Sequence, residues 1–183
     1  MESLKACYSL SIMRDALKWI VIVGVFLLLF VPLFNPESLF FLYITGKNFA
    51  FRIVVEIIFA AWILLALYDR EYRPRFSWIL VSLAAFVAII FLADIFGISP
   101  AKSLWSNFER MEGFVTLAHL LAYFVVAACV LNTEKWWTRF FAVSLVACSI
   151  VSCIAFLQLA GVLSIAQGGV RIEAWMGNAI YLA

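Results

Sequence analysis

Long apolar runs, each close to the length of a membrane-spanning helix, constrain the fold of this chain more than any other feature. A helix needs about 20 mainly apolar residues to cross the roughly 30 Å hydrocarbon core of a bilayer. Of the 183 residues, 67% are hydrophobic and only 13% are charged, which excludes an ordinary soluble domain. The runs are continuous rather than alternating, which excludes an outer-membrane barrel. We therefore expect an all-α polytopic membrane protein.

Breaks between the apolar runs divide the chain into five expected spans and the start of a sixth. Prolines and glycines mark several of these breaks, as at Pro32, Pro74 and Gly97. No small-residue cleavage site follows the first run, so we expect that run to be retained as a helix. Residues 1–183 then form a single transmembrane domain, with spans at about 16–34, 49–68, 78–97, 114–131 and 140–159 and a sixth that begins at about 177.

The segments between the spans are expected to be short and irregular. Residues 1–18 form a polar lead-in, and residues 35–48 form a connection whose apolar part lies against the bilayer surface. The stretch that opens at Ser103 is expected to be a loop rich in polar and aromatic groups. A turn at residues 132–135 leads into the fifth span.

The distribution of lysine and arginine sets the expected orientation, because short cytoplasmic loops carry more of these residues than outer loops. With the amino terminus in the cytoplasm, the inner segments hold eight of them and the outer segments five. The inner eight include Arg70, Arg73 and Arg75 in one short turn, which is hard to translocate. We therefore expect a cytoplasmic amino terminus. The formal net charge of +2 is too small to indicate a nucleic-acid partner.

The four cysteines favour neither a disulfide nor a metal site. Cys7, Cys129, Cys148 and Cys153 lie in or near expected helices, and no C-x-x-C or Cys/His metal spacing is present. They are typical of small apolar residues in a helical membrane protein.

Polar side chains gather in the half of the membrane that the expected topology makes the outer half. A charge near the bilayer centre costs about 2.5–3.5 kcal/mol on insertion scales, so each intramembrane charge requires a reason. The spans contribute Arg52, Glu56, Asp94 and His119, and the loops add Lys47, Lys102, Glu109, Arg110, Glu112, Arg171 and Glu173. The inner half of each span is nearly free of charge. This asymmetry indicates a functional outer face.

The intramembrane residues also have structural explanations. Arg52 and Glu56 are four residues apart on one helix face, and we expect them to form an i,i+4 ion pair. Asp94 either caps its helix or neutralises an arginine on a neighbour. His119 is expected to be a hydrogen-bonded packing residue rather than a catalytic base.

The outer-loop arginines have weaker structural explanations. Arg110 and Arg171 lie against the positive-inside bias, and each has a carboxylate one or two residues away. A guanidinium binds phosphate in a bidentate manner, so these arginines indicate a site for a phosphate or pyrophosphate headgroup. Glu109 and Glu112 precede a helix, where the helix dipole favours negative charge.

Four sequence blocks carry a resemblance to a known family. They are GKNFAFRIVVEIIFAAWILLAL (46–67), YRPRFS (72–77), LADIFGISPAKSLWSNFERMEGFVTLAHLLAYF (92–124) and RIEAWMGNAIYLA (171–183). In order and spacing they resemble the amino-terminal half of the O-antigen ligase family, which includes O-antigen polymerases and protein O-oligosaccharyltransferases. The W-S-N-x-E-R-M-E-G and R-x-E…G-N-x-x-Y-L-A motifs are specific when they occur together.

The resemblance implies a metal-independent glycosyltransferase of the bacterial inner membrane that uses no cofactor. Such an enzyme takes a glycan from an undecaprenyl-pyrophosphate carrier on the outer leaflet. It joins the glycan to an acceptor, which is lipid A-core, a growing glycan or a protein. By motif position, Arg52, Arg110 and Arg171 are expected to hold the pyrophosphate. The supporting polar residues are Glu56, Asp94, Glu109, Glu112, His119 and Glu173.

The family's large outer loop, which carries an important histidine and further arginines, lies between later spans than those matched here. We therefore expect the catalytic residues beyond Ala183. The chain is expected to supply the first five spans and the start of the sixth, to be inactive alone, and to pair with a missing carboxy-terminal half. Its other expected partners are the lipid-linked donor, the acceptor and membrane lipids.

Two other functions remain open. The first is a small non-catalytic membrane protein that binds a polyprenyl phosphate or partner helices. The second is a transporter-like half that pairs with another chain, although no internal repeat supports it.

Overall fold

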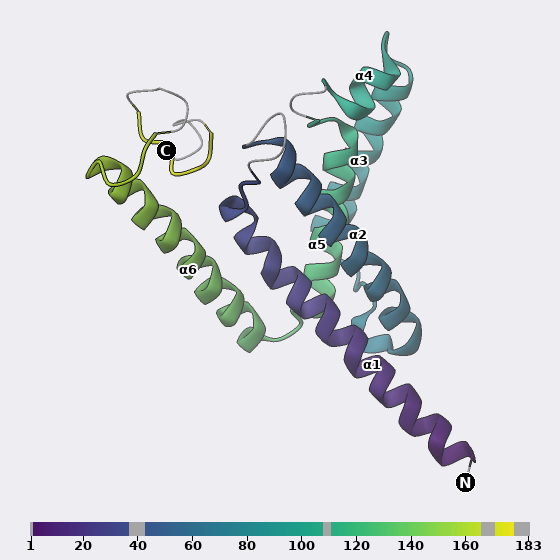
Figure 1. The fold of residues 1–183 in the computed structure, drawn as a ribbon. Helices are drawn as coiled ribbons and strands as arrows, with labels where there is room; N and C mark the ends of the chain where they lie inside the picture. The colour runs from purple at the N-terminus through teal and green to yellow at the C-terminus, as the bar shows by residue number, and fades with distance from the viewer. Residues whose placement is uncertain (1, 37–42, 108–110, 166–170, 178–183) are drawn as a thin grey trace.

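The computed structural model of the chain is built from helices joined by short connections (Figure 1). It describes residues 2–36, 43–107, 111–165 and 171–177, with side chains from Ser11 onwards, and the described residues contain no strand. The all-α class expected from the sequence is therefore confirmed. The elements are α1 Glu2–Leu27, η1 Leu28–Leu33, α2 Thr45–Tyr68, η2 Arg70–Tyr72, α3 Trp78–Ile95, α4 Pro100–Trp105, α5 Phe114–Val130 and α6 Glu134–Leu159.

Four helical segments of the described chain are long and apolar enough to cross a membrane. They are Ser11–Leu33, Thr45–Tyr68, Trp78–Ile95 and Glu134–Leu159. The helix α5 is also apolar, but at 17 residues it is shorter than these four. This length and composition are those of a membrane protein.

Several helices are longer than the expected spans because their first turns are polar. The helix α1 begins at Glu2, so the expected lead-in is helical, and α2 begins at Thr45 rather than at residue 49. The helix α6 begins at Glu134, directly after Thr133, whose extended backbone marks the boundary. Hydropathy locates the part of a helix that is apolar enough for the bilayer interior. The helix itself can extend further, because many polar residues are also compatible with helical backbone.

Prolines shape two of the connections. The 3₁₀ segment η1 contains Pro32, and the chain becomes extended at Phe34. Pro100 occupies the start of α4, where its missing N–H has no helical partner to lose. The stretch expected to be a loop from Ser103 is therefore helical as far as Trp105.

The core of the molecule lies between α1, α2 and α5. Its fully buried residues recur at helical spacing, which places each set on one face. They include Val21 and Val25 on α1, Leu28 at the start of η1, Val55, Ile58, Trp62 and Leu65 on α2, and Val126 and Val130 on α5. Trp62 lies in this core rather than at a membrane surface, and its indole N–H donates to the Tyr72 carbonyl at 3.0 Å.

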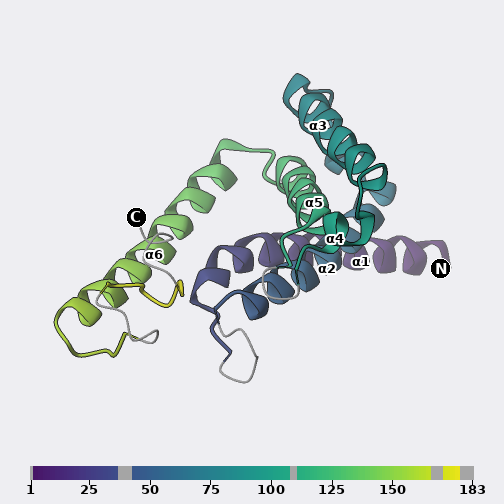
Figure 2. The same ribbon diagram turned by 90° about the horizontal axis from the view of Figure 1, so that it is seen from above.

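The helices α3 and α6 lie on different sides of this core (Figure 2). The helix α3 packs against α5 and α4, and the start of α6 contacts α1 through Trp136, whose ring lies edge-on to Trp19 and Phe26. Large apolar side chains on both helices face outwards, among them Ile79 and Phe156. Outward apolar surface of this kind is compatible with lipid.

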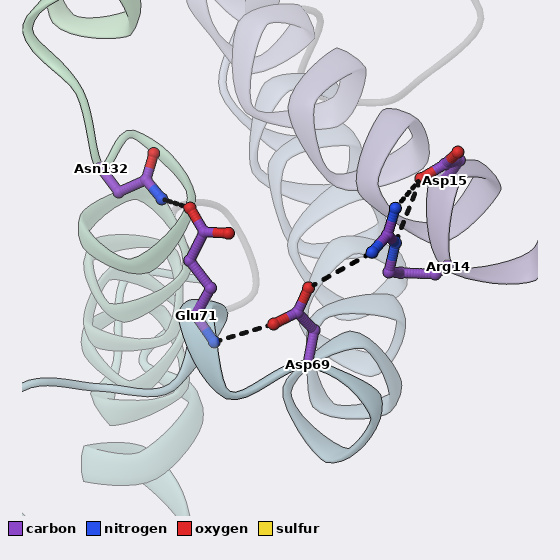
Figure 3. A network of polar contacts seen from close by, with 5 residues as sticks. All are labelled: Arg14, Asp15, Asp69, Glu71 and Asn132. Carbon is purple, nitrogen blue, oxygen red and sulfur yellow. Dashed lines mark hydrogen bonds and ion pairs between the residues drawn. The ribbon is translucent and has the colours of Figure 1, made fainter. Parts of the chain in front are cut away.

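The helices run up and down, so the connections collect at two ends of the molecule (Figure 1). One end holds η1, the start of α2, α4, the start of α5 and the 171–177 segment. At the opposite end a polar network joins α1, the connection between α2 and α3, and the connection between α5 and α6 (Figure 3). Asn132 donates to Glu71 at 2.8 Å, the Glu71 N–H donates to Asp69 at 3.0 Å, and Arg14 lies 3.9 Å from Asp69.

Candidate functional site

A buried arginine lies at the interface of α2 and α5, near the end that holds α4 and the 171–177 segment. Arg52 is in the second turn of α2 and is only 7% exposed. Its Nη2 donates to the Met111 carbonyl and, at 2.7 Å, to the Thr116 hydroxyl. The Thr116 hydroxyl donates in turn to the Met111 carbonyl at 3.1 Å. The guanidinium is thus oriented by two oxygens of the segment that opens α5.

Both acceptors of Arg52 are neutral. Among the described residues, no carboxylate lies within 4 Å of this guanidinium, and its buried Nε has no hydrogen-bond partner there. Glu56 favours the charge only from longer range. A buried cation is costly unless a counter-ion or an anionic ligand stabilises it, and no counter-ion lies close to Arg52 among the described residues.

The expected ion pair between Arg52 and Glu56 is wrong. The Glu56 Oε1 atom instead lies 3.2 Å from Nε2 of His119 on α5. The physical reason is that α5 packs along α2, so each charged side chain finds a partner across the helix interface. The exposed Glu56 reaches over this interface, whereas Arg52 points into it.

His119 is held at both ring nitrogens. Its Nδ1 lies 2.6 Å from the Val115 carbonyl, and its Nε2 contacts Glu56. A carbonyl and a carboxylate both accept hydrogen bonds, so His119 makes both contacts as donor only when both nitrogens carry protons. His119 is therefore hydrogen-bonded at both ring nitrogens within the interface of α2 and α5.

A second polar cluster joins the start of α2 to the 171–177 segment. The Lys47 ammonium donates to the Trp175 carbonyl at 2.7 Å, and the Glu173 carboxylate is close enough to stabilise its charge. Gln158, near the end of α6, accepts from the backbone N–H of Glu173 at 3.3 Å and of Ala174 at 2.8 Å. Glu173 is 2% exposed. These contacts fold the segment over α2 and tie it to α6.

The backbone of this segment is unusual. Ala174 and Trp175 have φ values of 45° and 63°, in the left-handed region that non-glycine residues seldom adopt. At Gly177, where φ is 77°, an added Cβ would lie 2.4 Å from the Cβ of Tyr43. Such conformations persist where the surroundings hold them, and they concentrate at functional sites.

A similar constraint shapes the turn before α5. Met111 has a φ of 52°, and an added Cβ at Gly113 would lie 2.3 Å from the Leu104 carbonyl oxygen. The turn therefore folds tightly onto α4. This close approach positions the Met111 carbonyl that Arg52 contacts.

The remaining predicted site residues that the structure describes form no hydrogen bond or ion pair with the Arg52 cluster or the Lys47 cluster. Arg171 is exposed and Asp94 is half-buried in the last turn of α3, and neither has a hydrogen bond or ion pair to another described residue. Glu112 is exposed beside Met111. Arg110 and Glu109 lie outside the described residues.

Sequence reasoning missed two residues that organise the site. Thr116 and Gln158 are uncharged, so a search for charged groups passes over them. Gln158 carried a signal nevertheless, because it is an amide in the last turn of an otherwise apolar span. Comparisons with protein-family models, curated proteins and solved structures find no match to this chain, so the geometry stands by itself.

Proposed function

We propose that this chain forms the donor-binding side of a membrane glycosyltransferase that resembles the O-antigen ligases. In this proposal α1, α2, α3, α5 and α6 each cross the bacterial inner membrane, with the amino terminus in the cytoplasm. The end that holds Arg52 and the 171–177 segment then faces outwards. The substrate bound there is the pyrophosphate of an undecaprenyl-linked glycan.

One observation carries the proposal: Arg52 is buried at 7% exposure, its acceptors are neutral, and its Nε has no hydrogen-bond partner among the described residues. The Met111 carbonyl and the Thr116 hydroxyl orient this guanidinium without cancelling its charge. An anion that approached it would gain a preorganised charged donor in surroundings of low dielectric constant.

Pyrophosphate is the anion that suits this chemistry best at a membrane surface. When a glycan leaves its lipid carrier, negative charge develops on the pyrophosphate, and fixed guanidinium groups stabilise that charge without a metal. Arg171 is exposed at the start of the 171–177 segment and offers a second such group. Arg110 completes the set by its place in the sequence motif. The acceptor, lipid A-core, a growing glycan or a protein, would approach from the outer side.

A second function is favoured by the contacts of His119. Because both of its nitrogens are engaged by Val115 and Glu56, His119 is not poised as a general base. A non-catalytic protein that binds a polyprenyl phosphate would need the arginines and no base. The two functions share the lipid-binding step and differ in whether a glycan is transferred.

Donor binding tests the proposal. The purified chain in detergent is titrated with undecaprenyl pyrophosphate, and bound lipid is counted by native mass spectrometry. We expect Arg171→Gln to weaken binding by about tenfold, as for loss of one charge-assisted hydrogen bond. Arg52→Lys keeps the charge but loses the planar donor set, and it should also weaken binding.

The matched control is Arg70→Gln, which removes the same charge from an exposed residue at the opposite end of the molecule. It should bind the lipid as the wild type does. Equal binding by wild type, Arg171→Gln and Arg52→Lys would refute the donor site. If binding follows the arginines but glycan transfer is absent in the presence of acceptor, the non-catalytic function is favoured.

A further inference from the structure

A second candidate ligand site lies at the end of the molecule opposite Arg52. A cavity of about 310 Å³ opens between the connection that leads from η2 into α3 and the last turns of α5. Its polar wall includes Glu71, Arg73, Arg75 and Asn132. Its apolar wall includes Leu80, Phe124, Val125 and Ala128. Nothing in the proposed glycosyl transfer uses this cavity.

Two of the three charged groups in the polar wall are already engaged. Glu71 accepts a hydrogen bond from Asn132 at 2.8 Å (Figure 3). Arg73 caps the end of α2, because its Nε donates to the Ala66 carbonyl at 2.8 Å and its Nη2 lies 3.5 Å from the Leu67 carbonyl. Both carbonyls are neutral, so Arg73 keeps its charge uncancelled.

Arg75 is the third charged group of the polar wall. It is exposed, and within the described parts of the chain it has neither a hydrogen bond nor an ion pair. The wall therefore carries two guanidinium groups against one carboxylate, and that carboxylate is turned towards Asn132. The electrostatics favour a ligand with a negative group at this rim.

The apolar wall of the cavity favours a ligand with a hydrocarbon part. One side of this wall is formed by Leu80 on α3 and by Phe76 just before α3. The other side is formed by Phe124, Val125 and Ala128 on α5. Both helices are apolar, and α3 turns large apolar side chains outwards along much of its length. A ligand that fills this cavity therefore has an anionic end near Arg75 and an apolar part between α3 and α5.

We propose that this cavity binds a phospholipid with a net negative headgroup. The phosphate is held by the guanidinium of Arg75, with Arg73 adding positive charge, and one acyl chain lies along Val125 and Ala128. A guanidinium matches two phosphate oxygens in its plane, which a point charge does not. The site is independent of the donor site at the other end.

Lipid binding by the full chain in detergent tests this proposal. Native mass spectrometry compares retention of phosphatidylglycerol with that of phosphatidylcholine of the same acyl chains. We expect phosphatidylglycerol to be retained, and Arg75→Gln to weaken its binding by about tenfold, which corresponds to one lost charge-assisted contact. Ala128→Phe, which fills the apolar wall, should also reduce retention while Arg75 stays in place.

Arg70→Gln is the matched control, because it removes an exposed charge from η2 outside the cavity. It should leave phosphatidylglycerol binding unchanged. Glycerol phosphate and inorganic phosphate are added as competitors to separate a lipid from a free phosphate. Displacement by either at low concentration, equal retention of the two lipids, or an equal loss in Arg75→Gln and Arg70→Gln would each overturn the proposal.

Discussion

At the scale of residues, the choice of partner decides what each charged group can do. Arg52 and Glu56 share a helix face, yet each contacts α5 rather than the other. Arg52 meets the neutral oxygens of Met111 and Thr116. Glu56 meets His119 and fixes its ring. The rotation of α2 against α5 therefore places Arg52 at the Met111–Thr116 turn and Glu56 at His119.

Thr116 should be important for stability because it is an acceptor for buried Arg52. Thr116→Val keeps the shape of the side chain but removes the hydroxyl, which leaves a guanidinium N–H and the Met111 carbonyl less satisfied. We expect it to lower the free energy of unfolding by about 1–3 kcal/mol. Unfolding in mixed micelles with increasing dodecyl sulfate, followed by circular dichroism, measures the change.

The control for this variant is Thr138→Val on α6. The Thr138 hydroxyl is exposed and bonds only to the Glu134 carbonyl of its own helix. This variant should be close to neutral. If both threonine variants cost the same, Thr116 has no special part in holding Arg52.

The sequence could locate the charged residues of the site but not their partners. The cost of burying charge marks Arg52, Glu56 and His119 in any topology, because each stands out against apolar neighbours. The pairing depends on how α2 is rotated against α5, which a single sequence does not encode in its spacing. Thr116 and the Met111 carbonyl carry no charge pattern at all, so they could not be singled out.

At the scale of elements, α1 and α2 pack closely because of one glycine. An added Cβ at Gly24 would lie 2.1 Å from Cγ2 of Ile58, a side chain that is 1% exposed. Small residues at such crossings let two helix backbones approach. The hydrophobic pattern predicts both helices, but the position of their closest approach appears only in the structure.

Gly24→Ala tests this packing with the smallest possible side chain. Ile58 is β-branched and buried, so it cannot turn away, and the two helices must move apart. We expect a loss of about 1–3 kcal/mol in the free energy of unfolding, typical of overpacking a tight interface. The same dodecyl sulfate titration measures it.

Val23→Ala is the neighbouring control, since Val23 is 58% exposed on the outer face of α1. It should change stability much less than Gly24→Ala. A neutral Gly24→Ala would contradict the close approach of α1 and α2.

The existence and order of the long helices followed from the sequence, whereas their ends did not. Apolar length predicts where hydrocarbon can surround the chain, but α6 continues back to Glu134 and α1 to Glu2 through polar turns. Stronger signals mark other boundaries. Pro100 opens α4 and Gly97 follows α3, and both agree with known breaker preferences.

At the scale of the whole molecule, the two ends differ in chemistry. One end holds a buried guanidinium, a strained backbone segment at 174–175 and the Lys47 cluster. The other holds the Arg14–Asp69–Glu71–Asn132 network and most of the arginines. The proposed function requires the first end to face away from the cytoplasm, because the donor glycan is presented on the outer leaflet.

Topology tests that central claim most directly. Alkaline phosphatase, which is active only outside the cytoplasm, is fused in separate variants after Ser106, Arg75 and Glu134. A fluorescent protein that fluoresces only in the cytoplasm is fused at the same three positions. We expect phosphatase activity after Ser106 and fluorescence after Arg75 and Glu134. Fluorescence after Ser106, with phosphatase activity after Arg75, would put the Arg52 site on the cytoplasmic side and contradict it.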